Sequence, residues 1–299
     1  MLPEFLINAL QKQYGPETAE TIQAGMEGPR RVSLRANRLK TTPEAVAALL
    51  EGAGIAYTRL PWYEDAFLLD SAAERDLWQL PAYAQGEIYL QSLSSMLPPL
   101  ALAPRAGADI LDMAAAPGGK TVQMAALTGN RANITACELH KIRAEKLQYN
   151  LQKQGAGRVN VMVRDARQLE DFFRFDQILL DAPCSGSGTL LLSQPGTLKA
   201  FSEKLVKNSA ALQTQLLRKA LRLLKPGGEM VYSTCSILEV ENEAVVRAAL
   251  HGVQAVLVPI ALPGQETLPL LPTALPGALC LRPTAEYEGF FVAKIKKEG

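Results

Sequence analysis

The sequence predicts an α/β protein in which a parallel sheet carries helices on both faces and follows a small α+β unit. From about residue 105 onward, short apolar runs alternate with helical patterns, as expected for parallel strands joined by crossover helices. Several of these runs end in an acidic residue, at the edge where open α/β sheets bind ligands. Residues 1–90 lack this alternation, so we expect two domains, at 1–90 and 91–299.

The first domain is predicted to be a small α+β unit. Residues 2–13 have a composition that suits a helix, and residues 32–37 alternate between apolar and polar side chains with the period of a half-buried strand. Thr42 is a suitable N-cap for a second helix, whose apolar stripe ends near Gly52 or Gly54.

The second domain is predicted to contain six strands and four helices. A turn at 225–228 leads into the fifth strand, and residues 252–283, rich in proline and leucine, give no clear pattern. The other expected strands are 110–111, 133–137, 159–163, 175–180 and 290–295, and the expected helices are 121–127, 141–154, 203–224 and 239–250.

Composition limits the classes of function. The chain has 299 residues, of which 48% are hydrophobic and 20% charged, and its net charge of +1 gives no global field to attract nucleic acid. We recognise neither a signal peptide nor a membrane-length apolar run, which favours a cytoplasmic protein without a membrane partner. The four cysteines are far apart and are expected to be thiols. Only Cys137 and His140 have a spacing that suits zinc, so no metal site is predicted.

Acidic residues follow four successive predicted strands, at Asp112, Glu138, Asp165 and Asp181. An acid at the end of the second strand can accept hydrogen bonds from both hydroxyls of a ribose, as in nucleotide-binding doubly wound folds. Helix capping and solvation are the alternative roles. The loop that follows Asp112 favours nucleotide binding.

That loop, residues 114–121 with the sequence AAAPGGKT, consists mostly of small residues that let a ligand approach the backbone closely. Its last three residues match the end of a phosphate-binding P-loop, but Ala114 stands where that motif requires its first glycine. The G-x-G-x-x-G pattern is also missing from the loop. The loop therefore fits a compact adenosyl ligand without a phosphate chain.

Two cysteines follow apolar runs that are expected to form neighbouring strands. Cys184 comes three residues after Asp181, and Cys235 comes directly after the run 230–234. Because the carboxyl ends of parallel strands meet at one edge, a carboxylate and two thiols should converge there. This combination suits covalent chemistry, although the pattern alone does not choose the nucleophile. Cys137 and Cys280 are expected to be small buried side chains.

Three motifs, in this order, resemble those of the RNA cytosine-C5 methyltransferase family. They are DMAAAPGGK at 112–120, DAPCSGSG at 181–188, and STCS at 233–236 followed by ENE at 241–243. The resemblance runs from about residue 30 to residue 293, and the opening LPEFL and the ending EGFF are most similar to the bacterial branch that acts on 16S ribosomal RNA. It implies a Rossmann-like sheet that uses S-adenosylmethionine and forms 5-methylcytosine.

The family's chemistry gives the two thiols different expected roles. C5 of cytosine is a poor nucleophile, and a thiolate that adds at C6 turns the ring into an enamine whose C5 can attack a sulfonium methyl. The resemblance assigns this attack to Cys235 and gives Cys184 a part in resolving the adduct. Asp181 is expected to lie against the polar edge of the base and to stabilise it as charge accumulates.

The resemblance also implies a set of cofactor contacts. Glu138 would hold the ribose hydroxyls, Asp165 the adenine amine, and Asp181 would lie near the transferred methyl. Arg143 matches a family arginine, with a solvated helix charge as the equal alternative. The residues expected to surround the methionine portion and the sugar are Ala114, Ala115, Ala116, Pro117, Gly118, Gly119 and Lys120.

Contacts to RNA are predicted at the densest basic cluster, in the first domain. Arg31 and Arg35 are expected to share one face of the predicted strand, with Arg38 and Lys40 close behind. The equal alternative is a solvated edge strand that positive charge protects from pairing. After the second motif, residues 190–192 are leucines where many relatives carry arginines.

The leading prediction is thus a monomeric methyltransferase acting on 16S ribosomal RNA, with transfer RNA as the alternative substrate. A P-loop ATPase that uses Lys120, with Asp181 as a metal ligand, is disfavoured by Ala114. An RNA-binding assembly factor without turnover is disfavoured by the two thiols, because binding needs neither of them.

Overall fold

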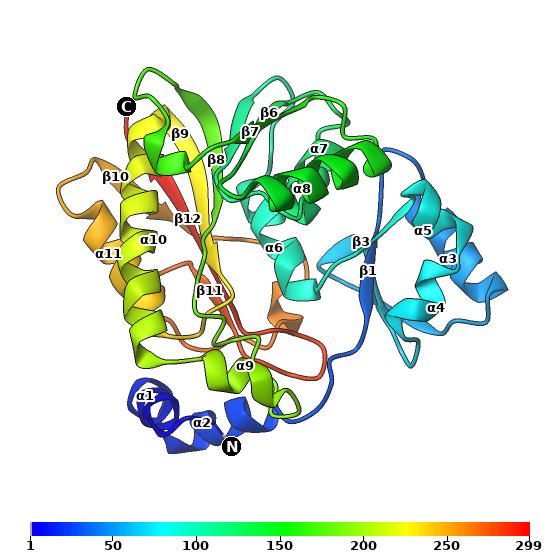
Figure 1. The fold of residues 1–299 in the computed structure, drawn as a ribbon, viewed down its shortest axis with the longest axis horizontal. Helices are drawn as coiled ribbons and strands as arrows, with labels where there is room; N and C mark the ends of the chain where they lie inside the picture. The colour runs from blue at the N-terminus through cyan, green and yellow to red at the C-terminus, as the bar shows by residue number, and fades with distance from the viewer. Residues whose placement is uncertain (1) are drawn as a thin grey trace.

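The computed structural model of the chain describes residues 2–299 and contains two sheets (Figure 1). The smaller sheet has four antiparallel strands in the order β2-β3-β1-β4. These strands are β1 (Ser33–Ala36), β2 (Tyr57–Leu60), β3 (Tyr63–Leu69) and β4 (Ile88–Leu90), and the helices beside them are α3 (Pro43–Gly52), α4 (Glu74–Trp78) and α5 (Pro81–Gln85).

The larger sheet has eight strands in the order β10-β12-β9-β8-β5-β6-β7, with β11 paired to β12. Its parallel part consists of β5 (Asp109–Asp112), β6 (Asn133–Glu138), β7 (Val159–Val163), β8 (Phe175–Asp181) and β9 (Leu224–Thr234). The prediction of a Rossmann-like α/β sheet behind a small α+β unit is confirmed. The sheet is mixed, however, because β10 (Ala255–Val258), β11 (Leu279–Leu281) and β12 (Phe290–Lys297) pair antiparallel.

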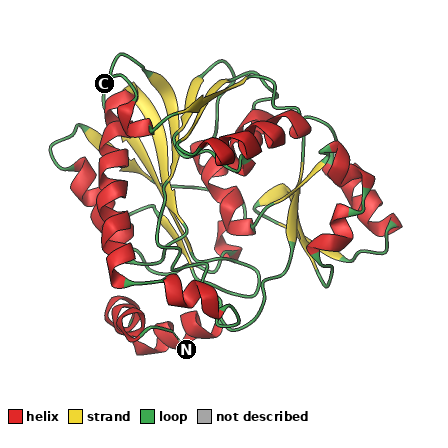
Figure 2. Ribbon diagram, viewed as in Figure 1, coloured by secondary structure: helices red, strands yellow, loops and turns green. Residues whose placement is uncertain are grey.

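Helices cover both faces of this sheet (Figure 2). Alternate residues of one strand enter opposite faces. In β8, Ile178 and Leu180 pack in the core beneath α10 (Glu203–Leu223) and α11 (Glu243–Leu250). Leu179, between them, packs in the opposite core with α6 (Leu93–Leu102), α7 (Gly119–Leu127) and α8 (Lys141–Gln154). An apolar run buried on both faces is typical of a central parallel strand.

The helix boundaries follow local capping. Thr42 Oγ1 accepts a hydrogen bond from Ala45 N at the start of α3, and Ser202 Oγ accepts one from Leu205 N at the start of α10. Helix α8 ends at Gly155, whose φ of 77° is the left-handed conformation that glycine adopts without steric cost.

Two predicted boundaries differ from the structure. The turn expected at 225–228 lies inside β9, because pairing with β8 starts at Leu224 and shifts register between Phe175 and Gln177. The helix expected at 239–250 is a short 3-10 turn, Glu239–Glu241, followed by α11. The break falls at Asn242, whose backbone is not helical and whose side chain bonds to the preceding loop.

The first two helices, α1 (Glu4–Tyr14) and α2 (Pro16–Ala24), pack against the larger domain rather than the small sheet (Figure 1). Their apolar residues Leu6, Leu10 and Ile22 are fully buried in the core that contains α10. The small sheet and its helices therefore begin near β1, whereas the sequence predicted one unit over residues 1–90. Within residues 2–299, no helix is both long enough and apolar enough to cross a lipid bilayer.

Candidate active site

The acidic residues predicted from the sequence lie at the carboxyl edge of the parallel strands. Asp112 ends β5, Glu138 ends β6 and Asp181 ends β8, while Asp165 follows β7 by two residues. Because these strands are adjacent in the sheet, the four carboxylates lie along one rim, as the sequence pattern predicts.

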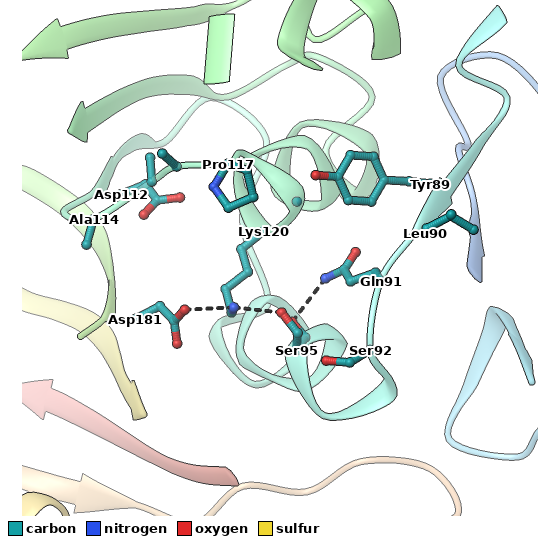
Figure 3. Close-up of a pocket in the computed structure, with 13 residues that line it drawn as sticks. Tyr89, Leu90, Gln91, Ser92, Ser95, Asp112, Ala114, Pro117, Lys120 and Asp181 are labelled. Carbon is teal, nitrogen blue, oxygen red and sulfur yellow. Dashed lines mark hydrogen bonds and ion pairs between the residues drawn. The ribbon is translucent and has the colours of Figure 1, made fainter. Parts of the chain in front are cut away.

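Two cavities open along this rim and adjoin at Ala114, which lines both. One, of about 210 Å³, is lined by Glu138, Arg143 and Asp165. The other, of about 230 Å³, is lined by Asp181 and by the loop after β5 (Figure 3). Its opposite wall comes from β4 and the start of α6, through Tyr89, Leu90, Gln91, Ser92 and Ser95, which the sequence did not predict as site residues.

Backbone bonds and close packing fix the loop 113–118. Met113 N donates to Leu179 O at 3.0 Å, and Ala115 N donates to Cys137 O at 2.9 Å, so the loop is tied to both neighbouring strands. Gly118 has a φ of 109°, and a Cβ there would lie 2.9 Å from the Leu147 side chain. Glycine is therefore required at position 118 by the backbone conformation and by the packing of Leu147.

Glu138 is oriented for a ligand. Its side chain is almost fully buried, and Oε1 accepts a hydrogen bond from His140 N at 2.9 Å and lies 3.4 Å from Arg143 Nη1. Within residues 2–299, Oε2 has no hydrogen-bond donor. Glu138 lines the cavity, and this second oxygen is open to it, which fits the predicted ribose contact. Arg143 also donates to Ala116 O at 3.0 Å.

Asp165 lies in the same cavity as Glu138 but has a partner of its own. Arg167 donates to both carboxylate oxygens, at distances of 2.6 to 3.1 Å, and this pairing holds the pKa of Asp165 below its usual range. A contact to an adenine amine would therefore share the carboxylate with Arg167, a residue that the sequence did not single out.

Lys120 points from the start of α7 toward Asp181 (Figure 3). Its Nζ lies 2.7 Å from Asp181 Oδ2 and donates to Ser95 Oγ at 2.7 Å, while Ser233 Oγ donates to Asp181 Oδ1 at 2.7 Å. Burial alone lowers the pKa of Lys120, but the Asp181 carboxylate outweighs it and the pKa is raised. The site therefore holds a fixed ion pair at the end of β8.

Thr121 argues against the P-loop alternative. In a P-loop the hydroxyl at this position binds Mg²⁺. Here Thr121 is fully buried, and its Oγ1 donates to Asp112 Oδ2 at 2.7 Å. Burial raises the pKa of Asp112 to about 6. This hydroxyl is therefore part of the protein core and does not face a metal ion.

Cys184 and Cys235 lie together, as predicted from the adjacent strands. Their Sγ atoms are 2.9 Å apart, just beyond the paired residues Asp181 and Ser233 of β8 and β9. The bonded Cys184 thiol, burial and the carboxylates of Asp181 and Glu288 hold the pKa of Cys235 well above its usual value. At neutral pH the free protein therefore carries Cys235 as a thiol, which must lose its proton before it can attack.

The other two cysteines are buried, as expected. Cys137 lies in β6 and Cys280 in β11, and burial raises the pKa of each thiol to about 12. Such thiols are inert side chains of the core. Among the cysteines of residues 2–299, Cys184 and Cys235 are the pair that lies together, close to Asp181 at the cavity.

The basic cluster of the first domain differs from the prediction. Arg35 is fully buried on β1, an inner strand, where its Nε donates to Gln91 Oε1 at 3.2 Å. A guanidinium enclosed in this way cannot reach a phosphate, so the structure contradicts the predicted RNA contact of Arg35. The edge-strand alternative is wrong as well, because β1 has strands on both sides.

The remaining members of the cluster are bound within the protein. Arg31 pairs with Asp70 at 2.5 Å and Glu286 at 3.0 Å. Arg38 pairs with Glu64 and Asp65. Lys40 Nζ donates to the carbonyls of Gln85 and Lys153, each at 2.7 Å. A role for Arg31, Arg38 and Lys40 in RNA binding stays a prediction, and these pairs reduce the net charge that they offer to RNA.

Comparisons with known proteins agree with the predicted resemblance. Residues 99–296 match the family described as 16S rRNA methyltransferase RsmB/F, and residues 2–75 match its ferredoxin-like domain. The ribosomal RNA small subunit methyltransferase F of Shewanella loihica is 37% identical over 90% of this chain, and that of Shewanella amazonensis is 40% identical over 73%. These alignments cover 57% and 47% of the relatives, so the chain spans about half the length of the curated relatives it matches.

Solved structures give the same result. A methyltransferase homolog protein from Pyrococcus horikoshii is 33% identical, with a TM-score of 0.83 over 99% of this chain and 100% of that one. NSun6 from Pyrococcus horikoshii, solved with SFG, has a TM-score of 0.88 over 99% of this chain and 98% of its own, and at 23% identity it shows the shared fold. The motifs, the fold and the matched residues together establish that this chain belongs to the 16S rRNA methyltransferase RsmB/F family.

Proposed function

We propose that this chain is an S-adenosylmethionine-dependent methyltransferase that forms 5-methylcytosine in 16S ribosomal RNA through a covalent bond between Cys235 and C6. The observation that carries the proposal is the pair of thiols at 2.9 Å beside the Lys120–Asp181 ion pair. Binding RNA requires neither thiol, whereas addition to a pyrimidine and its reversal can use both.

The residues of the two cavities fit the cofactor. The loop after β5 offers small side chains where the two cavities meet at Ala114, and Glu138 keeps one carboxylate oxygen free for a ribose hydroxyl. The cofactor supplies an electrophilic methyl group when bound. Asp181 and Ala114 line the same cavity, and Asp181 lies beside the thiols, which supports methyl transfer between these two residues.

The protein's own groups suit each stage of the reaction. The Cys235 thiol releases its proton to solvent and the thiolate forms a bond with C6 of the cytosine, and the ion pair of Lys120 and Asp181 stabilises the charge that develops on the ring. After C5 is methylated, Cys184 acts as a thiolate and takes the C5 proton to become a thiol, while the electrons of the C5–H bond re-form the C5–C6 double bond and expel the Cys235 thiolate from C6. The target base must leave its stack to reach these groups.

We expect the RNA product to carry 5-methylcytosine in 16S ribosomal RNA. The test compares bisulfite maps of ribosomal and transfer RNA from cells with and without the protein, because C5 methylation protects cytosine from conversion. Protection confined to transfer RNA would favour the alternative substrate. An identical map in both cells, together with RNA binding by the purified chain, would favour an assembly factor without turnover.

We expect Glu138→Gln to weaken binding of S-adenosylhomocysteine about 10- to 100-fold, since charge-assisted hydrogen bonds contribute about 1.5–3 kcal/mol. Titration calorimetry measures the change. Glu145→Gln, which neutralises an exposed carboxylate on α8, is the matched control and should leave the affinity unchanged. Tight binding of ATP with magnesium, and none of the adenosyl ligand, would reverse the choice of cofactor.

A further inference from the structure

Glu241 is a fully buried carboxylate at the end of the 3-10 turn behind the two thiols. It accepts four hydrogen bonds. Oε1 accepts hydrogen bonds from Ser185 N at 2.8 Å and from Gln213 Nε2 at 3.2 Å. Oε2 accepts hydrogen bonds from Ser185 Oγ at 2.5 Å and from Ser236 Oγ at 2.7 Å. One carboxylate therefore joins the loop after β8, the loop after β9 and helix α10.

The bonded serines are the immediate neighbours of the two thiols. Ser185 follows Cys184 and Ser236 follows Cys235, so Glu241 holds the residue next to each reacting sulfur. A direct backbone bond from Gly188 N to Cys235 O, at 3.0 Å, links the same two loops. The Ser187 hydroxyl, which bonds to Ser236 Oγ at 2.8 Å and accepts from Ile237 N at 3.0 Å, is a further link, so Glu241 is the link that joins the residues directly beside both thiols.

Glu241 is itself held in place. Tyr232 donates its hydroxyl to Glu241 O at 2.6 Å, and Asn242 Nδ2 donates to Ser236 O at 2.9 Å. Gln213 also donates to Pro183 O at 2.9 Å, which fixes the residue before Cys184. The carboxylate therefore sits in a network of fixed donors that can transmit its position to both loops.

The Glu241 cluster contains a buried carboxylate, which is an unusual choice if the cluster serves only the stability of the fold. Within residues 2–299, the Glu241 carboxylate forms no ion pair, and all of its side-chain donors are neutral. A buried carboxylate is costly to desolvate, and apolar packing of the same volume is often no less stable. A strong acceptor of four bonds does, however, orient its donors sharply.

We propose that Glu241 is a positioning residue that fixes the separation and direction of Cys184 and Cys235. The proposal rests on the proposed function, in which one thiol attacks the ring and the other takes its proton. Glu241 touches neither the base nor the reacting sulfurs. A misplacement of about 1 Å of a reacting group costs about 100-fold in rate, so loss of this anchor should act on the chemical step.

Glu241→Gln keeps the volume but removes the charge and replaces one acceptor oxygen with an NH₂ donor, so the hydroxyls of Ser185 and Ser236 must turn from donating to accepting, and both loops lose charge-assisted bonds. We expect kcat for methyl transfer to fall about 100-fold, while KM for RNA and Kd for the cofactor change less than about twofold. Ser185→Ala and Ser236→Ala each remove one hydroxyl donor and should lower kcat less. These milder variants keep the proposal testable if Glu241→Gln does not fold.

A second measurement reports on the two thiols without RNA or cofactor. Diamide oxidises neighbouring thiols: two S–H bonds break, one S–S bond forms, and the N=N bond of diamide is reduced to a hydrazine. In the unaltered protein the Cys184–Cys235 disulfide should form rapidly, because the sulfurs are 2.9 Å apart. Glu241→Gln should slow this reaction at least about tenfold, since the effective concentration of one thiol at the other falls.

Gln177→Leu is the matched control. Gln177 is fully buried at the other end of β8, where it donates to Leu102 O and Ala103 O and accepts from Arg105 N. This variant should lower the melting temperature without changing kcat or the rate of oxidation. If Gln177→Leu and Glu241→Gln lowered kcat and the rate of oxidation equally, the positioning role would be overturned, and Glu241 would contribute to stability alone.

The outcomes separate this proposal from the proposed function. An RNA adduct trapped by Cys184→Ala, together with unchanged kcat and oxidation rate in Glu241→Gln, would overturn the positioning role alone. Slow oxidation in Glu241→Gln, with no adduct in any cysteine variant, would overturn the covalent mechanism while supporting the positioning of the two thiols.

Discussion

Cys235→Ala should abolish methyl transfer and any covalent complex with RNA, whereas Cys184→Ala should accumulate a protein–RNA complex that survives denaturing electrophoresis. The Sγ atoms of the two thiols are 2.9 Å apart, so a bound base can reach both of them. The two variants should therefore differ because the thiols act in different steps of the reaction. Blocking the first covalent step prevents the intermediate, and blocking the second traps it.

The expected size of the effect is large in both variants. Removal of an attacking nucleophile typically leaves only the catalysis supplied by binding and electrostatics, a loss of about 10⁴- to 10⁶-fold. Cys184→Ala should complete about one methyl transfer per protein molecule and then stop. The measurement pairs transfer of a radiolabelled methyl group with gel analysis of the adduct.

Cys137→Ala is the control, because it removes a buried thiol that does not face the cavity. It should form no stable adduct and should retain turnover. An adduct with Cys235→Ala and none with Cys184→Ala would exchange the two roles. Full methyl transfer without an adduct in either variant would contradict a covalent mechanism.

Periodicity predicted most of the catalytic sheet because its strands are short apolar runs with polar ends. The run at 178–180 alternates between two cores, and the acids that follow such runs reach one rim because parallel strands share their direction. The thiols were predicted for the same reason. In each case the regular geometry of a strand fixes which face and which end of the sheet a residue occupies, so its place can be predicted from its spacing along the chain.

Other features depend on contacts between distant segments, which no local pattern encodes. Arg35 has the alternation of a half-buried strand, yet its side chain is enclosed where it bonds to Gln91, which in turn bonds to Gln123 of α7 in the larger domain. Helices α1 and α2 are amphipathic, but the sequence does not state which core receives them. The ion pair of Lys120 with Asp181 joins residues 61 positions apart, and the motifs suggested a cofactor contact for Lys120 and contacts to the cofactor and the base for Asp181, but not that the two residues pair.

Asp181→Asn should lower methyl transfer about 100- to 1000-fold, the range typical for removal of one group that stabilises transition-state charge. The side chain keeps its shape and its bond from Ser233, so the loss should come from charge and not from packing. Cofactor affinity should change little, because Glu138 and the loop after β5 make the other contacts. Rapid-quench measurement of a single turnover isolates this step.

The variant should also change the titration of Lys120. Burial lowers the pKa of this amine, and Asp181 is the main group that raises it again. In Asp181→Asn the pKa of Lys120 should therefore fall, so the ammonium that is fully present at low pH is lost at a lower pH than in the unaltered protein. Residual activity should decline as pH rises through this lowered pKa.

Lys120→Met and the double variant Asp181→Asn/Lys120→Met complete the test. If the ion pair acts as one unit, the double variant should be no slower than the slower single variant, because the first change already removes the pair. If the rate reduction in the double variant equalled the product of the reductions in the two single variants, Lys120 and Asp181 would act separately on the base. A rate within about threefold of the unaltered protein in Asp181→Asn would remove the carboxylate from the chemical step, since stabilisation of developing charge is worth far more than that.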